Sequence, residues 1–103
     1  MANAFADLPL PVNNGPGAAV DTSLFGLEKT LTCIGTFEQT TITIEASVDG
    51  GATWAPVHLF QMGTPDVVLV EVVANRMRTN VSGRKTLIPF AVNCDVAAPA
   101  ATP

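Results

Sequence analysis

The chain has 103 residues, of which 48% are hydrophobic and only 14% are charged. A chain of this length folds as one domain with one modest core, and a typical soluble domain carries about 25% charged residues. The formal net charge is −4, and the five lysines and arginines form no continuous basic stripe. Direct nucleic-acid binding is therefore not expected, because it needs one cation for each phosphate that is neutralised. The low charge predicts a surface partly covered by neighbouring molecules; an unusually hydrophobic monomer is the alternative.

No membrane contact is expected, because no run approaches the roughly 18 apolar residues of a membrane helix. The opening residues also lack the basic segment and apolar run of a secretory signal, which favours synthesis in a cytoplasm. Cys33 and Cys94 are too far apart in the sequence for a zinc site or a Cys-x-x-Cys motif. A reducing compartment favours two buried free thiols, and a disulfide between an early and a late strand is the alternative.

The first 24 residues predict an extended N-terminal arm. Prolines, asparagines and glycines interrupt any regular element, while Phe5, Leu8, Leu10 and Val12 provide apolar anchors. A merely flexible tail would be polar. We therefore expect these side chains to lie either on the protein's own core or on a neighbouring subunit.

Residues 25–95 have a hydrophobic period of two, which is typical of half-buried strands. Ile42, Ile44 and Ala46 give the clearest example, since each alternates with a polar residue. Glycine-, proline- and asparagine-containing turns separate the expected strands, which cover residues 18–25, 27–34, 41–47, 54–60, 67–73, 76–81 and 87–94. The pattern predicts an all-β fold, a single antiparallel β-sandwich of six to seven strands, jelly-roll or immunoglobulin-like. The Pro/Ala-rich residues 96–103 predict a C-terminal tail.

No motif indicates an enzyme, a metal or a cofactor. His58 is the only histidine and lies within an expected strand, without a cysteine or carboxylate at metal-ligand spacing. The nine aspartates and glutamates fall mostly at turns or on polar strand faces, where solvation is their ordinary role. We therefore expect no catalytic activity, because no proton-transfer group stands out.

The most specific local pattern is Ser-x-Asp-x-Gly-x-Thr-Trp, which runs from residue 47 to residue 54. It is similar to the Asp box of sialidase-like propellers, where the box is a repeated folding device away from the catalytic centre. We expect Asp49 to accept backbone hydrogen bonds beside Ser47, Gly50 and Gly51 to adopt positive φ, and Trp54 to pack over the hairpin. The pattern predicts a structural turn, and one copy in a short chain does not indicate a propeller.

Three further motifs lie between about residue 26 and residue 95: Gly35-Thr36-Phe37, the segment 41–54 that ends at the tryptophan, and the segment 78–83 that ends in Ser-Gly. Through these motifs the region resembles small β-sandwich virion proteins of tailed bacteriophages. Capsid decoration (cement) proteins are the nearest members in size and in their arm-like N-terminus. An immunoglobulin reading is weaker, because the tryptophan follows the first cysteine at too great a distance.

The resemblance implies a structural protein of the virion, assembled in the host cytoplasm and bound on the capsid surface. It would bind between major capsid protein subunits, stabilise the head, and form a homo-oligomer, either a trimer or a dimer. The expected contacts are the apolar arm residues and a basic cluster: Phe5, Leu8, Leu10, Val12, Arg76, Arg78, Arg84 and Lys85. The alternatives are a tail, fibre or head–tail module of the virion, and a small carbohydrate-binding β-sandwich that uses Trp54 as its platform.

Overall fold

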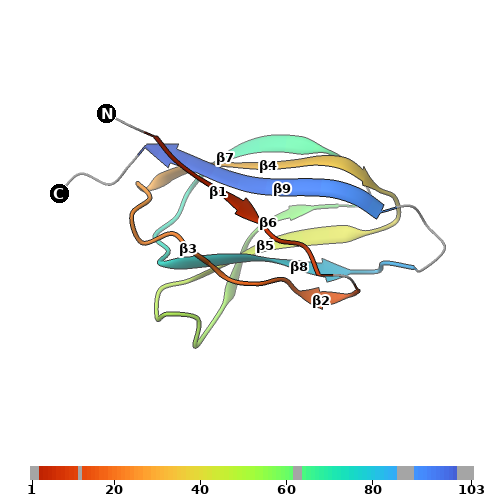
Figure 1. Ribbon diagram of the computed structural model, residues 1–103, viewed down its shortest axis with the longest axis horizontal. Helices are drawn as coiled ribbons and strands as arrows, with labels where there is room; N and C mark the ends of the chain where they lie inside the picture. The colour runs from red at the N-terminus through yellow and green to blue at the C-terminus, as the bar shows by residue number, and fades with distance from the viewer. Residues whose placement is uncertain (1–2, 12, 62–63, 86–89, 100–103) are drawn as a thin grey trace.

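The computed structural model describes residues 3–11, 13–61, 64–85 and 90–99. These residues form nine β-strands and no helix (Figure 1). In chain order the strands are β1 (Asn3–Leu8), β2 (Gly15–Pro16), β3 (Val20–Asp21), β4 (Glu28–Phe37), β5 (Thr41–Ser47), β6 (Ala55–Phe60), β7 (Asp66–Glu71), β8 (Arg76–Ser82) and β9 (Phe90–Pro99).

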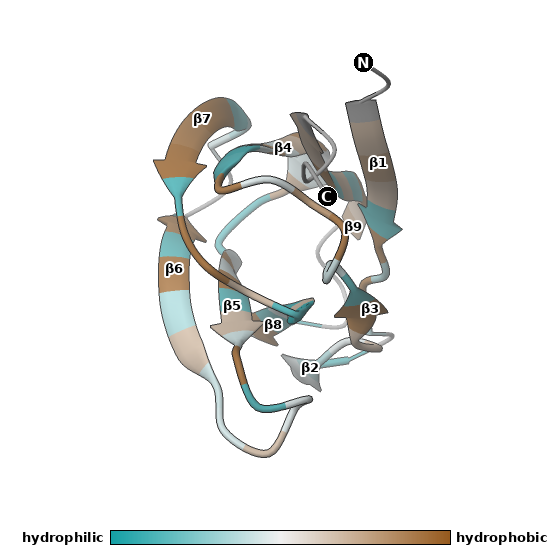
Figure 2. Ribbon diagram, turned by 90° about the vertical axis from the view of Figure 1, so that its left-hand side faces the viewer, coloured by the Kyte–Doolittle hydropathy of each residue, from teal (hydrophilic) through white to brown (hydrophobic). Residues whose placement is uncertain are grey.

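The strands form two antiparallel sheets that pack on each other. One sheet has the order β1-β9-β4-β7, and the other has the order β2-β8-β5-β6 with β3 also paired to β8. Figure 2 views this sandwich from one end, with β7, β4, β9 and β1 above β6, β5, β8 and β2. The predicted all-β fold with two packed antiparallel sheets is confirmed. The expected number of six to seven strands is wrong, because three strands instead of one precede β4 and the described residues form nine.

The N-terminal segment belongs to the sheets, and no extended arm is seen in its described residues. Every residue of β1 has a partner in β9, and Leu8, opposite Cys94, is only 2% exposed. The chain then crosses to the second sheet, where the Thr79 hydroxyl donates a 2.8 Å hydrogen bond to the carbonyl of Pro9. The amide of Gly17 donates to the carbonyl of Thr79 at the same distance. Proline and glycine here mark turns between short strands, which composition does not distinguish from an arm.

The boundary expected after residue 24 lies between β3 and β4, and the boundary expected after residue 95 lies inside β9. The segment 1–24 includes β1, β2 and β3, and β9 continues through residues 96–99 of the expected tail. Val12, the start of the expected strand 87–94 and the last four residues lie outside the described residues.

Alternate side chains of β4, β5, β8 and β9, which form the two longest ladders, make up most of the core. In β4 the inward residues include Leu31, Cys33 and Phe37, which are fully buried, and the residues between them face outward. The same period of two places Ile42 and Ile44 of β5 in the core. Facing inward from the other strands are Leu8, Phe60, Met77, Val81, Cys94 and Val96. Since side chains alternate between the faces of a strand, the polar threonines of β4 and β5 reach the outside.

Lys29 is an exception to the apolar inward row of β4. Its residue is only 1% exposed, and its Nζ donates to the carbonyls of Gly26, at 2.8 Å, and Val72. Burial lowers the pKa of Lys29, because removal from water disfavours the ammonium form. The two carbonyls replace water as acceptors, so the ammonium joins the loop before β4 to the chain that follows β7.

Gly35 allows the close approach of β4 and β9, which predicts that Gly35→Ala destabilises the fold. The residue has φ +134°, and a Cβ placed there would lie 2.3 Å from the carbonyl oxygen of Ala91. Backbone strain and the clash together should lower the free energy of unfolding by about 3–5 kcal/mol in urea denaturation. Gly50→Ala is the matched control, since Gly50 has φ +73° with open space around it and should cost only about 1–2 kcal/mol. Equal losses would show that the β9 contact is unimportant.

Candidate interaction surface

The outer face of the sheet β1-β9-β4-β7 carries large exposed apolar side chains. Strand register places Phe5, Ala97, Thr30 and Leu69 in one row across all four strands. Phe5 is 64% exposed and Leu69 is 65% exposed, while the two residues between them are small. The middle of the row is therefore flat, and a large apolar side chain projects at each end of it. Hydrophobic colouring along β7 in Figure 2 marks one end of it.

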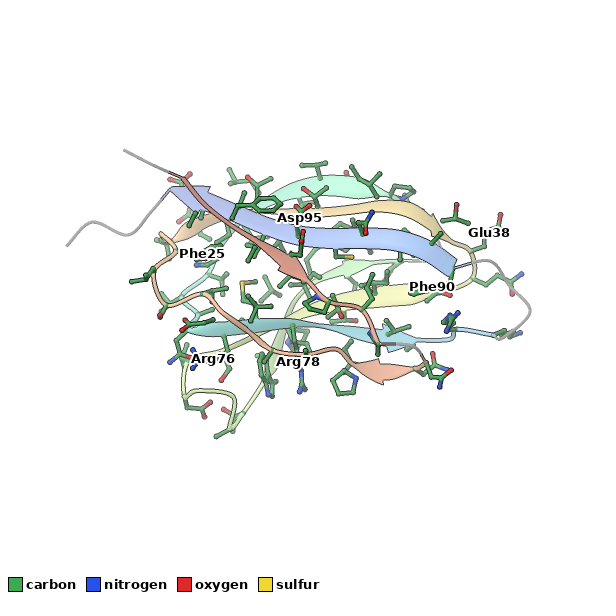
Figure 3. All side chains as sticks on the ribbon, in the orientation of Figure 1. Phe25, Glu38, Arg76, Arg78, Phe90 and Asp95 are labelled. Carbon is green, nitrogen blue, oxygen red and sulfur yellow. The ribbon has the colours of Figure 1, made fainter. Side chains whose placement is uncertain are left out.

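A second row on this face combines acidic and apolar groups. The register aligns Asp7, Asp95, Thr32 and Val67, and Asp95 is labelled in Figure 3. Burial raises the pKa of Asp95, and the charge of Asp7 adds to the increase, while a hydrogen bond with Thr32 opposes it. Two carboxylates directly opposite each other in a ladder repel. The row therefore stores a small unfavourable electrostatic energy at neutral pH.

We call the exposed side of these two rows, together with Ile34, the outer face. Ile34 is exposed and lies opposite Asn93 in the β4–β9 ladder. Among the described residues of its four strands the only lysine or arginine is Lys29, which faces inward. The outer face is therefore apolar and acidic, without a cation of its own.

The opposite sheet presents a polar network that uses two of the expected basic contacts. Arg78 donates from Nε to Glu45 Oε1 at 2.7 Å, and Asn80 lies 3.4 Å from both oxygens of the same carboxylate. The Arg78 guanidinium also lies 4.2 Å from the centre of the Trp54 ring. Arg76 forms a 3.2 Å ion pair with Asp21, and Figure 3 shows both arginines on β8. These cations neutralise acidic groups of the same molecule.

The remaining expected contacts do not form one patch. The Arg84 guanidinium lies 4.5 Å from the centre of the Phe90 ring, and Arg84 exchanges backbone hydrogen bonds with the Asn14 side chain. Lys85 is exposed. Leu8 lies in the core and Leu10 packs against it, so among the described apolar contacts expected in the arm only Phe5 is exposed.

The 47–54 loop has the hydrogen bonds of a closed structural turn. The Ser47 hydroxyl donates to Asp49 Oδ1 at 2.6 Å and accepts from the amide of Gly51 at 2.9 Å. The amide and hydroxyl of Thr53 donate to the two oxygens of Asp49, and Trp54 Nε1 donates to the carbonyl of Gly51. Gly50 and Gly51 have φ values of +73° and +99°. These donors, Ser47 first, hold the pKa of Asp49 far below its ordinary value.

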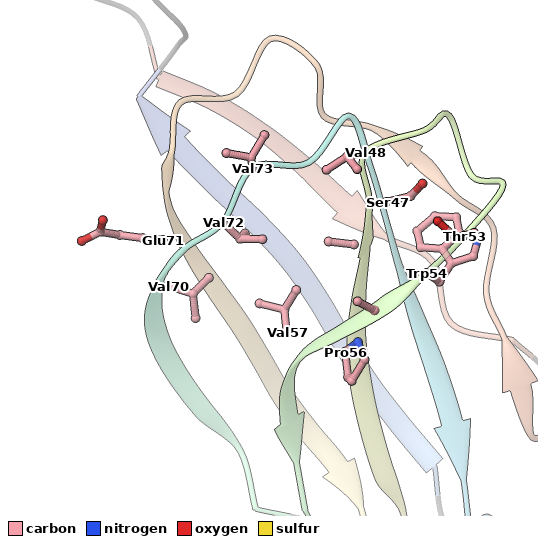
Figure 4. Close-up of a pocket in the computed structure, with 12 residues that line it drawn as sticks. Ser47, Val48, Thr53, Trp54, Pro56, Val57, Val70, Glu71, Val72 and Val73 are labelled. Atoms are coloured by element: carbon pink, nitrogen blue, oxygen red, sulfur yellow. The ribbon is translucent and has the colours of Figure 1, made fainter.

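A cleft of about 420 Å³ lies beside this loop, between β5, the start of β6 and the end of β7. Figure 4 shows Val57, Val70 and Val72 along one side, with Ser47 and Trp54 toward the other. One face of the Trp54 ring is occupied by Arg78 and its Nε1 by a backbone carbonyl. One face of the Trp54 ring and its Nε1 are therefore engaged within the protein.

His58 contacts the Phe60 ring edge-on, with 4.8 Å between the ring centres. Within the part of the chain that the structure describes, no three or more His, Cys, Asp or Glu residues come together as a metal site. No helix long and apolar enough to cross a membrane occurs among the same residues. In comparisons with known proteins, no family model, curated protein or solved structure matches this chain.

The outer face was not predicted from the sequence, because strands that are far apart in the chain pair to form it. The signal was present in residues 67–73, where every residue except Glu71 is apolar, a pattern that places apolar side chains on both faces of a strand. Val68 and Val70 pack against the core, whereas Val67 and Leu69 point outward. Since β7 is at the edge of its sheet, this run leaves an exposed apolar border on that edge.

Ser47→Ala should destabilise the protein, because Ser47 is buried and its hydroxyl connects Asp49 to the amide of Gly51. Loss of these bonds should lower the free energy of unfolding by about 1–3 kcal/mol in urea denaturation. The exposed Ser82, at the end of β8, offers a matched Ser→Ala control that should change stability by less than about 0.5 kcal/mol. Identical stabilities of the two variants would contradict the role of the loop.

Asp7→Asn should stabilise the protein at neutral pH. A carboxyl with a raised folded pKa binds a proton more readily in the folded chain, so its contribution to stability falls as the pH rises through that pKa. Removing the Asp7 charge should raise the free energy of unfolding at pH 7 by at most about 1 kcal/mol. The gain should shrink near pH 3, below the ordinary aspartate value of about 3.9.

Thermal unfolding of both proteins across this pH range measures the difference. Glu38→Gln, in an exposed turn position, is the control for loss of one negative charge. A gain that persisted unchanged at low pH would argue against repulsion between Asp7 and Asp95.

Proposed function

We propose that this protein is a structural component of a virion, a capsid decoration (cement) protein that binds between major capsid protein subunits and stabilises a bacteriophage head. The observation that supports the proposal is the outer face, where Phe5, Ile34, Val67 and Leu69 are all exposed. Exposed apolar groups gathered on one face mark a contact site. The proposal also takes the fold to be a jelly-roll or immunoglobulin-like sandwich.

Burial of the outer face provides the binding energy in this proposal. Each buried apolar Å² contributes roughly 25 cal/mol, and Phe5 and Leu69 present the largest side chains of the row. The carboxylates of Asp7 and Asp95 disfavour an acidic partner, so the complementary surface on the capsid is apolar with polar or basic borders. Binding to the assembled shell in preference to free subunits stabilises the shell by mass action.

The proposed contacts differ from those expected from the sequence. Leu8 is not among them, because its side chain contributes to the core. Arg78 is not among them either, because it holds Glu45 and stacks on Trp54. A trimer or dimer at a symmetric capsid junction would multiply a modest contact by avidity.

The test compares Leu69→Lys with Leu59→Lys in co-sedimentation with expanded heads from the same source. Both leucines are exposed, one on β7 and one on β6 of the other sheet, so the chemical change is matched. Leu69→Lys should weaken head binding by about tenfold or more, as loss of an anchor residue does, while Leu59→Lys should bind like the wild type. Thermal unfolding of both variants checks that neither change disrupts the fold.

Equal binding of the two variants would remove the outer face from the proposal. Failure of the wild type to bind heads would remove the decoration role. Labelled wild-type protein on whole virions, viewed by electron microscopy, separates the second candidate, because a signal confined to the tail identifies a tail, fibre or head–tail module.

A further inference from the structure

The two cysteines of the chain meet in the middle of a sheet. Cys33 of β4 and Cys94 of β9 are directly opposed in the antiparallel ladder. They are 0% and 3% exposed, both are free thiols, and their Sγ atoms lie 3.0 Å apart. The proposed function uses neither residue, so the pair requires its own explanation.

The backbone around the pair already has the spacing that a disulfide needs. Directly opposed Cα atoms in an antiparallel ladder are about 4.5–5.5 Å apart, and disulfides span about 4.4–6.8 Å. The β4–β9 register continues on both sides, with Leu31 opposite Val96 and Gly35 opposite Val92. Bond formation therefore needs no change in strand pairing.

One of the two cysteines lines a cleft beside the N-terminal segment. The volume of this cleft is about 440 Å³, and Cys94 lines it together with Leu8 and Leu10 of the N-terminal segment and Val92 of β9. Leu8 is the partner of Cys94 in the β1–β9 ladder. Cys33 does not line the cleft, so a reagent in the cleft reaches Cys94 first.

We propose that Cys33 and Cys94 form a dithiol site that a small-molecule disulfide, entering through the cleft beside β1, converts into a cross-strand disulfide. The Cys94 thiolate attacks one sulfur of the small disulfide, forms a mixed disulfide and releases one thiolate. The Cys33 thiolate then attacks the Cys94 sulfur and releases the second thiolate. The two leaving thiolates take up the two protons that the cysteines lose, and the two electrons from the cysteines reduce the small disulfide to two thiols.

The folded protein makes this conversion slow. The hydrogen bond to Cys33 and burial raise the pKa of the Cys94 thiol, and the charge of Asp95 adds to the increase. Because the thiolate is the attacking species, a raised pKa lowers the reaction rate at neutral pH. The rate should therefore increase as the pH is raised, and the dithiol should persist where the surroundings are reducing.

The disulfide would join two residues that are 61 positions apart in the sequence. Closing a loop of this length restricts the unfolded chain strongly. Oxidation should raise the midpoint of thermal unfolding by about 10 °C or more.

The test uses the purified full chain incubated with oxidised glutathione. The expected result is loss of two hydrogen atoms in the intact mass without a bound glutathione, no free thiol in denaturant, and a raised unfolding midpoint that dithiothreitol reverses. Cys33→Ser should give at most a glutathione adduct and no such midpoint shift. Two thiols that stay free, or a lasting glutathione adduct on the wild type after unfolding and refolding in the reagent, would overturn the proposal.

A pair of matched variants tests the entry route. Leu8→Ala and Leu31→Ala each remove a buried leucine side chain, but only Leu8 lines the cleft. Disulfide formation in Leu8→Ala should be about tenfold faster or more than in Leu31→Ala, after correction for the stability of each variant. Equal corrected rates would exclude entry beside β1. The measurements that test this inference do not depend on the capsid role, since none of them requires a head.

Discussion

The register of two central ladders, β4 with β9 and β5 with β8, determines both the core and the surface of this protein. Since the side-chain period of a strand is two, a slip by one residue would exchange the faces of every strand involved. Inward positions hold Leu31 and Phe37 of β4 and Ile42 of β5. The same register that buries these residues leaves Phe5 and Leu69 exposed in one row. The apolar outer face is thus a direct consequence of how the core is paired.

Features encoded locally could be predicted from the sequence. The alternation in residues 41–47 predicted β5. The Ser-x-Asp-x-Gly-x-Thr-Trp pattern predicted a closed turn, because the bonds among Ser47, Asp49, Gly51, Thr53 and Trp54 join residues at most four positions apart. The additional bonds of Asn75 with Val48 and Gly50 are long-range and could not be predicted in this way. The role of residues 3–8 could not be predicted in this way. Their partner is β9, at the other end of the chain, and composition does not specify which distant strand an edge segment joins.

The contact residues expected from the sequence also have partners that are far away in the chain. Charge alone grouped Arg76 and Arg78 as a basic patch, yet the β5–β8 register places Glu45 opposite Arg78 and β3 brings Asp21 to Arg76. These partners are recognisable only after the sheet is known. Likewise, a separation of 61 residues between the cysteines carries no signal, whereas their opposed positions in the β4–β9 ladder bring the two Sγ atoms to 3.0 Å.

The dithiol and the outer face lie on opposite sides of the same two strands. Cys33 and Cys94 point into the core, while their neighbours Thr32 and Asp95, and Ile34 and Asn93, pair on the outside. A bond between the sulfurs would fix the spacing of β4 and β9 beneath the centre of the outer face without changing any outward side chain. Because a preorganised surface loses less conformational freedom on binding, oxidation would strengthen attachment through rigidity alone. The proposed redox site and the proposed interface are thus coupled by backbone pairing.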